Sequence, residues 1–267
     1  MPTILQRNNV QISGRGTKPL IFAHGFGCDQ EMWRFVAPRF EADYRVVLFD
    51  YVGAGNSHWG AYDPHHYATF EGYKRDLLEI CDALELEDAI FVGHSVSSMI
   101  GALASIEAPS LFERLVMVAP SPCFLNHAPD YLGGFERAAI DSLFEIMDKN
   151  FAGWASFLAP VVTGTPGRDD IVREWEQSFC ATDPDIARRF ARATFFADNR
   201  AILACVTVPS LILQWACDAL VPLSVGRYLN QHLANSTLKI LKATGHYPHL
   251  TQPKATVRAI RDYLRYE

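Results

Sequence analysis

The sequence predicts an α/β fold in which a mostly parallel sheet carries helices on both faces. Short apolar runs alternate with segments of helical periodicity over most of the chain. These runs are continuous rather than interleaved with polar residues, which is typical of parallel strands that are buried on both faces. One long stretch, residues 121–200, contains no clear strand pattern and is typical of helices alone.

The expected elements follow the order that a parallel sheet with crossover helices requires. A weaker pattern at residues 3–12 suggests an antiparallel edge hairpin. Strands are expected at residues 20–23, 45–49, 89–92, 115–118, 210–214 and 237–241. Helices are expected at residues 30–40, 70–84, 95–106 and 253–266, the last with Pro253 in its first turn.

The helical stretch is expected to form a lid over the sheet. An insertion between two strands of a parallel sheet lies over their carboxyl ends, where open α/β sheets bind ligands. We therefore divide the chain into a core, residues 1–121 and 201–267, and a lid, residues 122–200. Within the lid, Asp183 and Pro184 predict the start of a helix over residues 185–197. The lid is dense in aromatic residues: Phe124, Tyr131, Phe135, Phe144, Phe151, Trp154, Phe157, Trp175, Phe179, Phe190, Phe195 and Phe196.

The composition and charge of the chain disfavour nucleic acid and membranes as binding partners. The 267 residues are 49% hydrophobic and carry a formal net charge of -6, which disfavours nucleic acid and anionic membranes as partners. The most apolar long stretch, residues 201–222, contains Thr207, Gln214 and Asp218, so we expect a buried strand rather than a membrane span. The N-terminus lacks the apolar region of a secretory signal, so we expect a soluble, cytoplasmic protein.

The six cysteines do not suggest disulfides. The chain is large, has no C-x-x-C pair and shows no export signal, so small buried hydrophobic side chains are the expected role. A metal site is not expected either, because His246 and His249 have no cysteine or acidic residue near them at metal-site spacing.

Residues 93–97, Gly-His-Ser-Val-Ser, predict a nucleophilic serine. They lie between an expected strand and an expected helix, where a sharp turn exposes the hydroxyl of Ser95 and needs small neighbours. Gly93 meets this need, and Ser97 replaces the usual glycine with another small residue. The alternative, in which Ser95 merely caps the helix, does not call for small residues on both sides.

A serine needs a base, and the base needs an acid to orient it. In this fold the chain order is serine, acid, histidine. Asp218 follows the expected strand 210–214, and His246 follows the strand 237–241, so both lie at the carboxyl edge with Ser95. His249 is the alternative base, and it is expected to have a structural role instead. His94 is expected to pack or to form hydrogen bonds rather than to catalyse.

An oxyanion hole needs preorganised backbone N–H donors. The N–H of Val96, after the serine, is one candidate, and the N–H of Phe26 in the loop of residues 24–27 is the other. His24 is expected to brace this loop; the alternative is a plain strand-to-helix turn. The glycine-rich turn of residues 50–57 does not match a nucleotide-binding motif, so a structural turn is expected there.

These motifs together resemble one family. Residues 24–27, 50–55, 93–97, 121–122, 179–183 and 245–249 are similar to those of RsbQ-like α/β-hydrolases of bacterial stress signalling and of their plant relatives, the karrikin and strigolactone receptor hydrolases. The resemblance extends over nearly the whole chain, lid included. It implies an α/β-hydrolase fold with a mostly parallel, eight-stranded-type sheet, helices on both faces and an inserted four-helix lid.

The resemblance also implies a function. Ser95, His246 and Asp218 would form a catalytic triad that cleaves small neutral esters or butenolide-like lactones, with no cofactor and no metal. The expected substrate pocket is lined by Phe26, Phe124, Phe135, Trp154, Phe157 and Phe195, with Val96 beside the serine. The alternative is a ligand-sensing module that activates a partner phosphatase. Dehalogenase and epoxide hydrolase chemistry is disfavoured, because those enzymes have an aspartate where this chain has Ser95.

Overall fold

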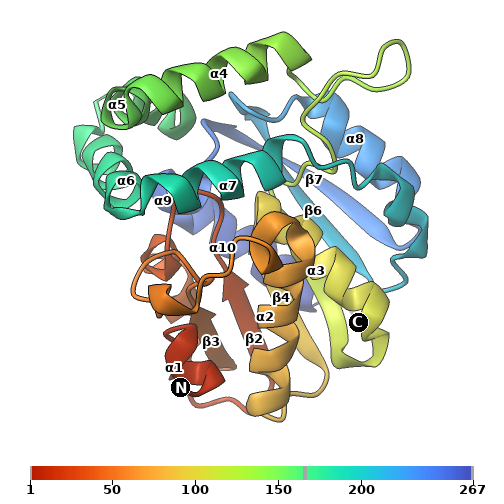
Figure 1. The fold of residues 1–267 in the computed structure, drawn as a ribbon. Helices are drawn as coiled ribbons and strands as arrows, with labels where there is room; N and C mark the ends of the chain where they lie inside the picture. Colours follow the sequence, from red (N-terminus) through yellow and green to blue (C-terminus); the bar gives the residue numbers. More distant parts are fainter. Residues whose placement is uncertain (1, 165–166, 266–267) are drawn as a thin grey trace.

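A twisted sheet forms the centre of the molecule (Figure 1). The computed structural model describes residues 2–164 and 167–265, and within them the sheet has seven strands in the order β1-β3-β2-β4-β5-β6-β7. Every neighbouring pair is parallel except β1 with β3, which is antiparallel. The strands are β1 (Gln11–Ser13), β2 (Pro19–Ala23), β3 (Arg45–Phe49), β4 (Ala89–His94), β5 (Phe112–Val118), β6 (Ser210–Cys217) and β7 (Ser236–Thr244).

The burial of the strands confirms the predicted sheet. Every residue of β2 and β4 is buried, as expected for central strands with helices on both faces. Helices α2 (Phe70–Ala83) and α3 (Val96–Glu107) lie in front of the sheet in Figure 1, whereas α10 (Pro253–Arg265) lies behind it. Helix α8 (Leu223–His232) packs against β6 and β7. The architecture is that of the α/β-hydrolase fold.

The N-terminal segment corrects the predicted strand count. An edge hairpin was expected over residues 3–12, but residues Ile4–Arg7 form a short helix, α1, and β1 is the single antiparallel edge strand there. The cause is a capping box: the Thr3 hydroxyl accepts from the Gln6 N–H, and the Gln6 side chain accepts from the Thr3 N–H. The sheet therefore has seven strands over the described residues rather than eight.

A second correction concerns residues 30–40, which were expected to form one helix. They form two short 3₁₀ helices, η1 (Gln30–Trp33) and η2 (Ala37–Arg39). Pro38 lies at the start of the second one. Proline has no N–H to give to a helix that runs through it, so the α-helix cannot continue from the first segment into the second.

Four helices follow one another in the lid: α4 (Arg137–Lys149), α5 (Phe151–Thr163), α6 (Asp169–Ala181) and α7 (Pro184–Phe195). Figure 1 shows them above the sheet, with α4 on the outside and α7 between α4 and the core. Asp183 caps α7 by accepting from two backbone N–H groups, as its position predicted. Helix α7 buries Ala187, Phe190, Ala191 and Phe195 on one face, the spacing of an amphipathic helix.

Two sets of contacts hold the lid in place: the first joins its two ends to each other, and the second joins it to the core. At its base, Cys123 and Asp198 form an antiparallel bridge, and the N–H of Asn199 donates to the Pro122 carbonyl at 2.7 Å. At the far end of α5, the N–H of His246 donates to the Val162 carbonyl at 2.6 Å. A Cβ at Gly245 would come within 2.1 Å of the Thr163 carbonyl oxygen, so only glycine allows this approach.

No helix among the described residues is long and apolar enough to span a membrane. All six cysteines are free. Cys28, Cys81 and Cys123 are buried, whereas Cys180, Cys205 and Cys217 are exposed, so the expected role as buried side chains holds for half of them.

A buried ion pair joins the N-terminal segment to helix α2. Asp76 of α2 is fully buried, and its carboxylate accepts from Arg7 at 2.9 Å, from the Asn8 amide at 3.0 Å and from the Tyr67 hydroxyl at 2.9 Å. Desolvation raises the pKa of this carboxyl, and the Arg7 charge opposes the rise. Three hydrogen bonds therefore share this one carboxylate in the protein interior, where the low dielectric constant strengthens each of them.

We expect Asp76→Ala to lower the free energy of unfolding by roughly 3–5 kcal/mol, because it removes the buried partner of the Arg7 charge and the acceptor of the Tyr67 hydroxyl. Arg7 keeps its ion pair with Glu79, and Asn8 keeps the Asp50 carbonyl. Urea unfolding followed by circular dichroism measures the loss. The matched control is Asp262→Ala, which removes the exposed ion pair with Lys239. A loss in Asp76→Ala no larger than in this control would contradict the assignment.

Candidate active site

Three side chains from separate strands meet at the carboxyl edge of the sheet. Ser95 follows β4, Asp218 follows β6, and His246 lies two residues after β7. The Ser95 hydroxyl lies 2.9 Å from Nε2 of His246. Nδ1 of His246 lies 2.8 Å and 3.0 Å from the two carboxylate oxygens of Asp218. The three residues therefore form one hydrogen-bonded line, in which Nδ1–H donates to the carboxylate and Nε2 accepts from the hydroxyl.

The backbone at Ser95 is strained. Its φ of 54° and ψ of -119° lie outside the regions that residues with a Cβ normally adopt. Such strain persists only where the surroundings enforce it, and it places the hydroxyl at the top of the turn. Small neighbours are required here: a Cβ at Gly93 would come within 2.7 Å of the Ser97 backbone. Ser97 fits, and its hydroxyl donates to the His24 carbonyl at 2.5 Å.

The acid and the base are held by their own loops. Oδ1 of Asp218 also accepts from the N–H groups of Leu220 and Val221, at 2.8 Å and 3.2 Å. The side chains of Asp218 and His246 are 0% and 1% exposed, so solvent does not compete for their hydrogen bond. His94 donates from Nε2 to the His246 carbonyl at 2.9 Å, which is the hydrogen-bonding role that its position predicted.

The loop of residues 24–27 contacts the turn at Ser95 through the Ser97 hydroxyl and the His94 ring. Nε2 of His24 accepts from the Tyr51 N–H at 3.1 Å, and its Nδ1 lies 2.9 Å from the Gly25 carbonyl. A Cβ at Gly25 would meet the His94 ring at 2.4 Å, so glycine is required there. Within the described residues, the N–H groups of Phe26 and Val96 donate to no other protein atom, which leaves both free for a developing oxyanion.

A cluster of aromatic rings roofs the site. The Phe26 ring packs edge-on against Phe179, Phe190 and Phe195, with centroids 5.5 Å, 5.6 Å and 6.2 Å away. Phe124 and Phe135 join this cluster through Phe195. Trp154 is buried and packs on Phe179 at 5.0 Å. Phe179 and Phe190 were not predicted as roof residues. Both belong to the buried apolar faces of α6 and α7, and the helical spacing of apolar residues in the sequence could have identified them.

Phe157 corrects the predicted pocket. It is 64% exposed, so it does not line a pocket in this structure. Helix α5 buries Trp154, Ala155, Ala159 and Val162 on one face, and Phe157 projects from the opposite face.

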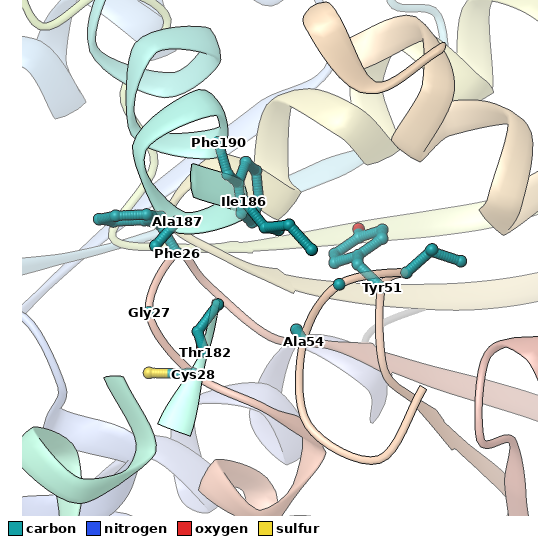
Figure 2. A pocket seen from close by; sticks show the side chains of 11 residues that line it. Phe26, Gly27, Cys28, Tyr51, Ala54, Thr182, Ile186, Ala187 and Phe190 are labelled. Carbon is teal, nitrogen blue, oxygen red and sulfur yellow. The ribbon is translucent and has the colours of Figure 1, made fainter. Parts of the chain in front are cut away.

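Two small apolar cavities border the roof. Figure 2 shows the first, which lies between the Phe26 loop, the Tyr51 turn and α7, with Ile186 and Phe190 on one wall. The second lies between α4, Trp154 and Phe195. Each has a volume of about 10 Å³, roughly the space of one water molecule, and neither is lined by Ser95.

His249, the alternative base, is fully buried against Trp33 and His94, with ring centroids 4.7 Å and 4.5 Å away. Among the described residues, neither of its ring nitrogens has a hydrogen-bond partner, so His246 alone is within reach of Ser95. Desolvation holds the pKa of both His94 and His249 well below the usual range, and the neighbouring histidines add to the shift. Both rings are therefore neutral.

Comparisons with known proteins agree with this architecture. Residues 20–259 match the model of the alpha/beta hydrolase family. A strigolactone esterase of Pisum sativum is 41% identical over 94% of this chain and 94% of its own length. A karrikin insensitive 2 receptor of Petunia hybrida is 39% identical over 97% and 94%. The solved structure of a hydrolase from Oleispira antarctica is 42% identical, with a TM-score of 0.97 over 99% of this chain and 97% of that one. The predicted relationship to the plant receptor hydrolases is thereby confirmed.

The buried histidines predict a stability that depends on pH. Their folded-state pKa lies below the unfolded value of about 6.5, so the unfolded chain binds more protons and stability falls as the pH drops below 6.5. Each histidine contributes up to about 1.4 kcal/mol per pH unit. We expect His249→Phe to flatten this slope between pH 7.5 and 5.5 in urea unfolding experiments. The exposed His65→Gln serves as control, and equal slopes in the two variants would refute the explanation.

Proposed function

This chain belongs to the alpha/beta hydrolase family, and from this premise we propose that it is a serine hydrolase that cleaves small neutral esters or lactones at Ser95. One observation carries the proposal: the hydrogen-bonded line from Asp218 through His246 to a serine hydroxyl on a strained turn. Backbone strain of this kind clusters at functional sites, and here it supports the presentation of the Ser95 hydroxyl as a nucleophile.

The geometry supports acyl transfer in two steps. In the first, the Ser95 hydroxyl attacks the carbonyl carbon and its proton passes to Nε2 of His246, while Asp218 stabilises the imidazolium. The N–H groups of Phe26 and Val96 hold the oxyanion. The tetrahedral intermediate then breaks the C–O bond, and His246 gives the proton to the departing alkoxide. In the second step, water activated by His246 releases the acyl group and restores the hydroxyl of Ser95.

The aromatic residues above the site favour a neutral, apolar substrate. The rings of Phe26, Phe124, Phe135 and Phe195, with Trp154 behind them, offer apolar surface and few hydrogen-bonding groups. An anionic or strongly polar acyl group would lose its hydration there without compensation. A neutral ester or lactone fits this surface, and the name of the relative from Pisum sativum, a strigolactone esterase, points the same way.

We expect Ser95→Ala and His246→Ala to lower kcat/KM for p-nitrophenyl acetate by at least about 10³-fold, because each removes a member of a unit that acts together. Ser105→Ala is the matched control. Its hydroxyl is also buried in α3 but donates only to the Ala102 carbonyl. Labelling with a fluorophosphonate followed by mass spectrometry should modify Ser95 alone. Undiminished turnover in Ser95→Ala would overturn the assignment of the nucleophile.

We expect Phe195→Ala to change KM for a hydrophobic ester while fluorophosphonate still acylates Ser95, since the ring contacts substrate and not the reacting atoms. Phe157→Ala provides the control, because that exposed ring of the same lid faces solvent. Steady-state kinetics with acetate and hexanoate p-nitrophenyl esters separates the two variants. If Phe195→Ala lost binding and acylation to the same degree, the ring would be a structural support for the site instead.

A second candidate function is regulatory, with the lid as the contact for another protein and hydrolysis as a secondary activity. The observation that favours this function is that α4 and α5 expose three apolar side chains, Ile146, Phe157 and Val161. The relative from Petunia hybrida is named a receptor, which favours the same idea. A phosphatase encoded beside this gene that binds the wild-type protein but not Phe157→Ser would support it.

A further inference from the structure

A second cluster of reactive side chains lies at the base of the lid. Cys123, His127 and Asp198 each direct one donor atom to a common point, and these three atoms all lie within 4.8 Å of one another. None of them belongs to the hydrogen-bonded line at Ser95. Two of them, Cys123 and Asp198, form the bridge that joins the chain entering the lid to the chain leaving it.

The spacing of the donors matches a tetrahedral ion. Sγ of Cys123 lies 3.6 Å from Nε2 of His127, and the same nitrogen lies 3.9 Å from Oδ2 of Asp198. With Zn–S bonds of about 2.3 Å and Zn–N or Zn–O bonds of about 2.0–2.1 Å, neighbouring ligands of a tetrahedral zinc ion are roughly 3.3–3.6 Å apart. The Sγ–Nε2 separation already has this value, and the Nε2–Oδ2 separation exceeds it by a few tenths of an ångström. All three donor atoms lie within 4.8 Å of one another, so an ion would draw Sγ and the carboxylate closer together.

The backbone and the neighbours of the cluster hold it in place. His127 exchanges two backbone hydrogen bonds with Tyr131, at 2.8 Å and 3.0 Å. The Tyr131 hydroxyl donates to the Cys123 carbonyl at 2.5 Å, and its ring packs under the Arg200 guanidinium at 5.0 Å. These contacts fix the backbone of His127 and Cys123, and so they limit where the two side chains can lie.

The carboxylate of Asp198 keeps one electron pair available. Its Oδ1 accepts from the backbone and the Nε of Arg200, whereas its Oδ2 accepts from Nη2 of Arg200 alone. Oδ2 is also the atom nearest to His127, so its second lone pair points toward the cluster. Arg200 thus orients the carboxylate and leaves the ligating oxygen free.

We propose that Cys123, His127 and Asp198 bind a zinc-class divalent metal ion, with water as the fourth ligand. A thiolate, an imidazole and a carboxylate suit Zn²⁺ and Co²⁺ and are unsuited to Mg²⁺ or Ca²⁺, which prefer oxygen. The side chains of His127 and Asp198 are 43% and 40% exposed, so an ion can enter and a water can reach the fourth position.

Metal binding releases one proton. When the ion binds, the S–H bond breaks, the S–metal bond forms and the proton leaves to solvent. The thiolate adds one negative charge beside the ion. The Asp198 carboxylate is shared between the ion and Arg200, so these four groups together carry one net positive charge. Without an ion the thiol donates to the Leu125 carbonyl at 3.7 Å, and the S–metal bond replaces this contact.

The location gives the ion a structural effect. Cys123 lies five residues after β5, and Asp198 lies three residues after α7, so the ion would cross-link the two stems of the lid. A ligand that binds the folded chain alone raises its stability in proportion to the logarithm of its concentration. Zinc would therefore tighten the lid base without touching Ser95.

The test uses Co²⁺ as a spectroscopic probe on the full chain, reduced and freed of metal with EDTA. We expect one Co²⁺ per chain, with the visible bands of tetrahedral cobalt and a thiolate-to-cobalt charge-transfer band, both abolished by added Zn²⁺. Cys123→Ser should remove the charge-transfer band. His127→Gln, at a half-exposed position that a folded chain tolerates, should weaken binding by at least about 100-fold, more than the loss of an outer-shell partner.

Matched controls are Cys205→Ser and His232→Gln, which change an exposed thiol and an exposed imidazole elsewhere. Both should bind Co²⁺ like the wild type, and Zn²⁺ should raise the thermal midpoint of these two controls but not of His127→Gln. Absence of the thiolate band from the wild type at millimolar Co²⁺ overturns the proposal. So does a band that survives in both Cys123→Ser and His127→Gln.

Discussion

The site depends on how closely three loops can approach one another at the carboxyl edge of the sheet. Ser95 reaches His246 at 2.9 Å only because the turn at Ser95 accepts strained dihedral angles and Gly93 has no Cβ to push α3 away. The same condition holds at Gly25, whose Cα packs against the His94 ring. That ring in turn holds the carbonyl of His246. Close backbone contact, enforced by a buried core, is what keeps the catalytic atoms in line.

The sequence predicted what local chemistry determines. The parallel strands, the turn at Ser95 and the positions of Asp218 and His246 after their strands followed from periodicity and from small residues around the serine. The failures were of two kinds. Two local signals were missed: the capping box of Thr3 and Gln6, which begins α1, and Pro38, which interrupts the helix expected at residues 30–40. The exposure of Phe157 is set by which face of α5 packs on the core, and an aromatic residue alone does not determine that.

The cluster of Cys123, His127 and Asp198, which we propose as a metal site, shows a different limit. Cys123 and His127 are four residues apart in a loop, and Asp198 follows more than seventy residues later. No short sequence motif therefore indicates that the three residues lie together. They meet because the two ends of the lid pair through a backbone bridge. The expectation that no metal is bound considered only residues near His246. Sequence reasoning finds sites built within one segment far more readily than sites assembled where a long insertion begins and ends.

The contact between His246 and α5 has a mechanical consequence. The N–H of His246 donates to the Val162 carbonyl, and the Thr244 hydroxyl donates to the Gly164 carbonyl at 2.8 Å. These two hydrogen bonds connect the end of α5 to the loop that carries the imidazole. Any tilt of α5 that admits a ligand also pulls on the peptide group of the proton carrier. The position of α5 and the position of the imidazole are therefore coupled through these two hydrogen bonds.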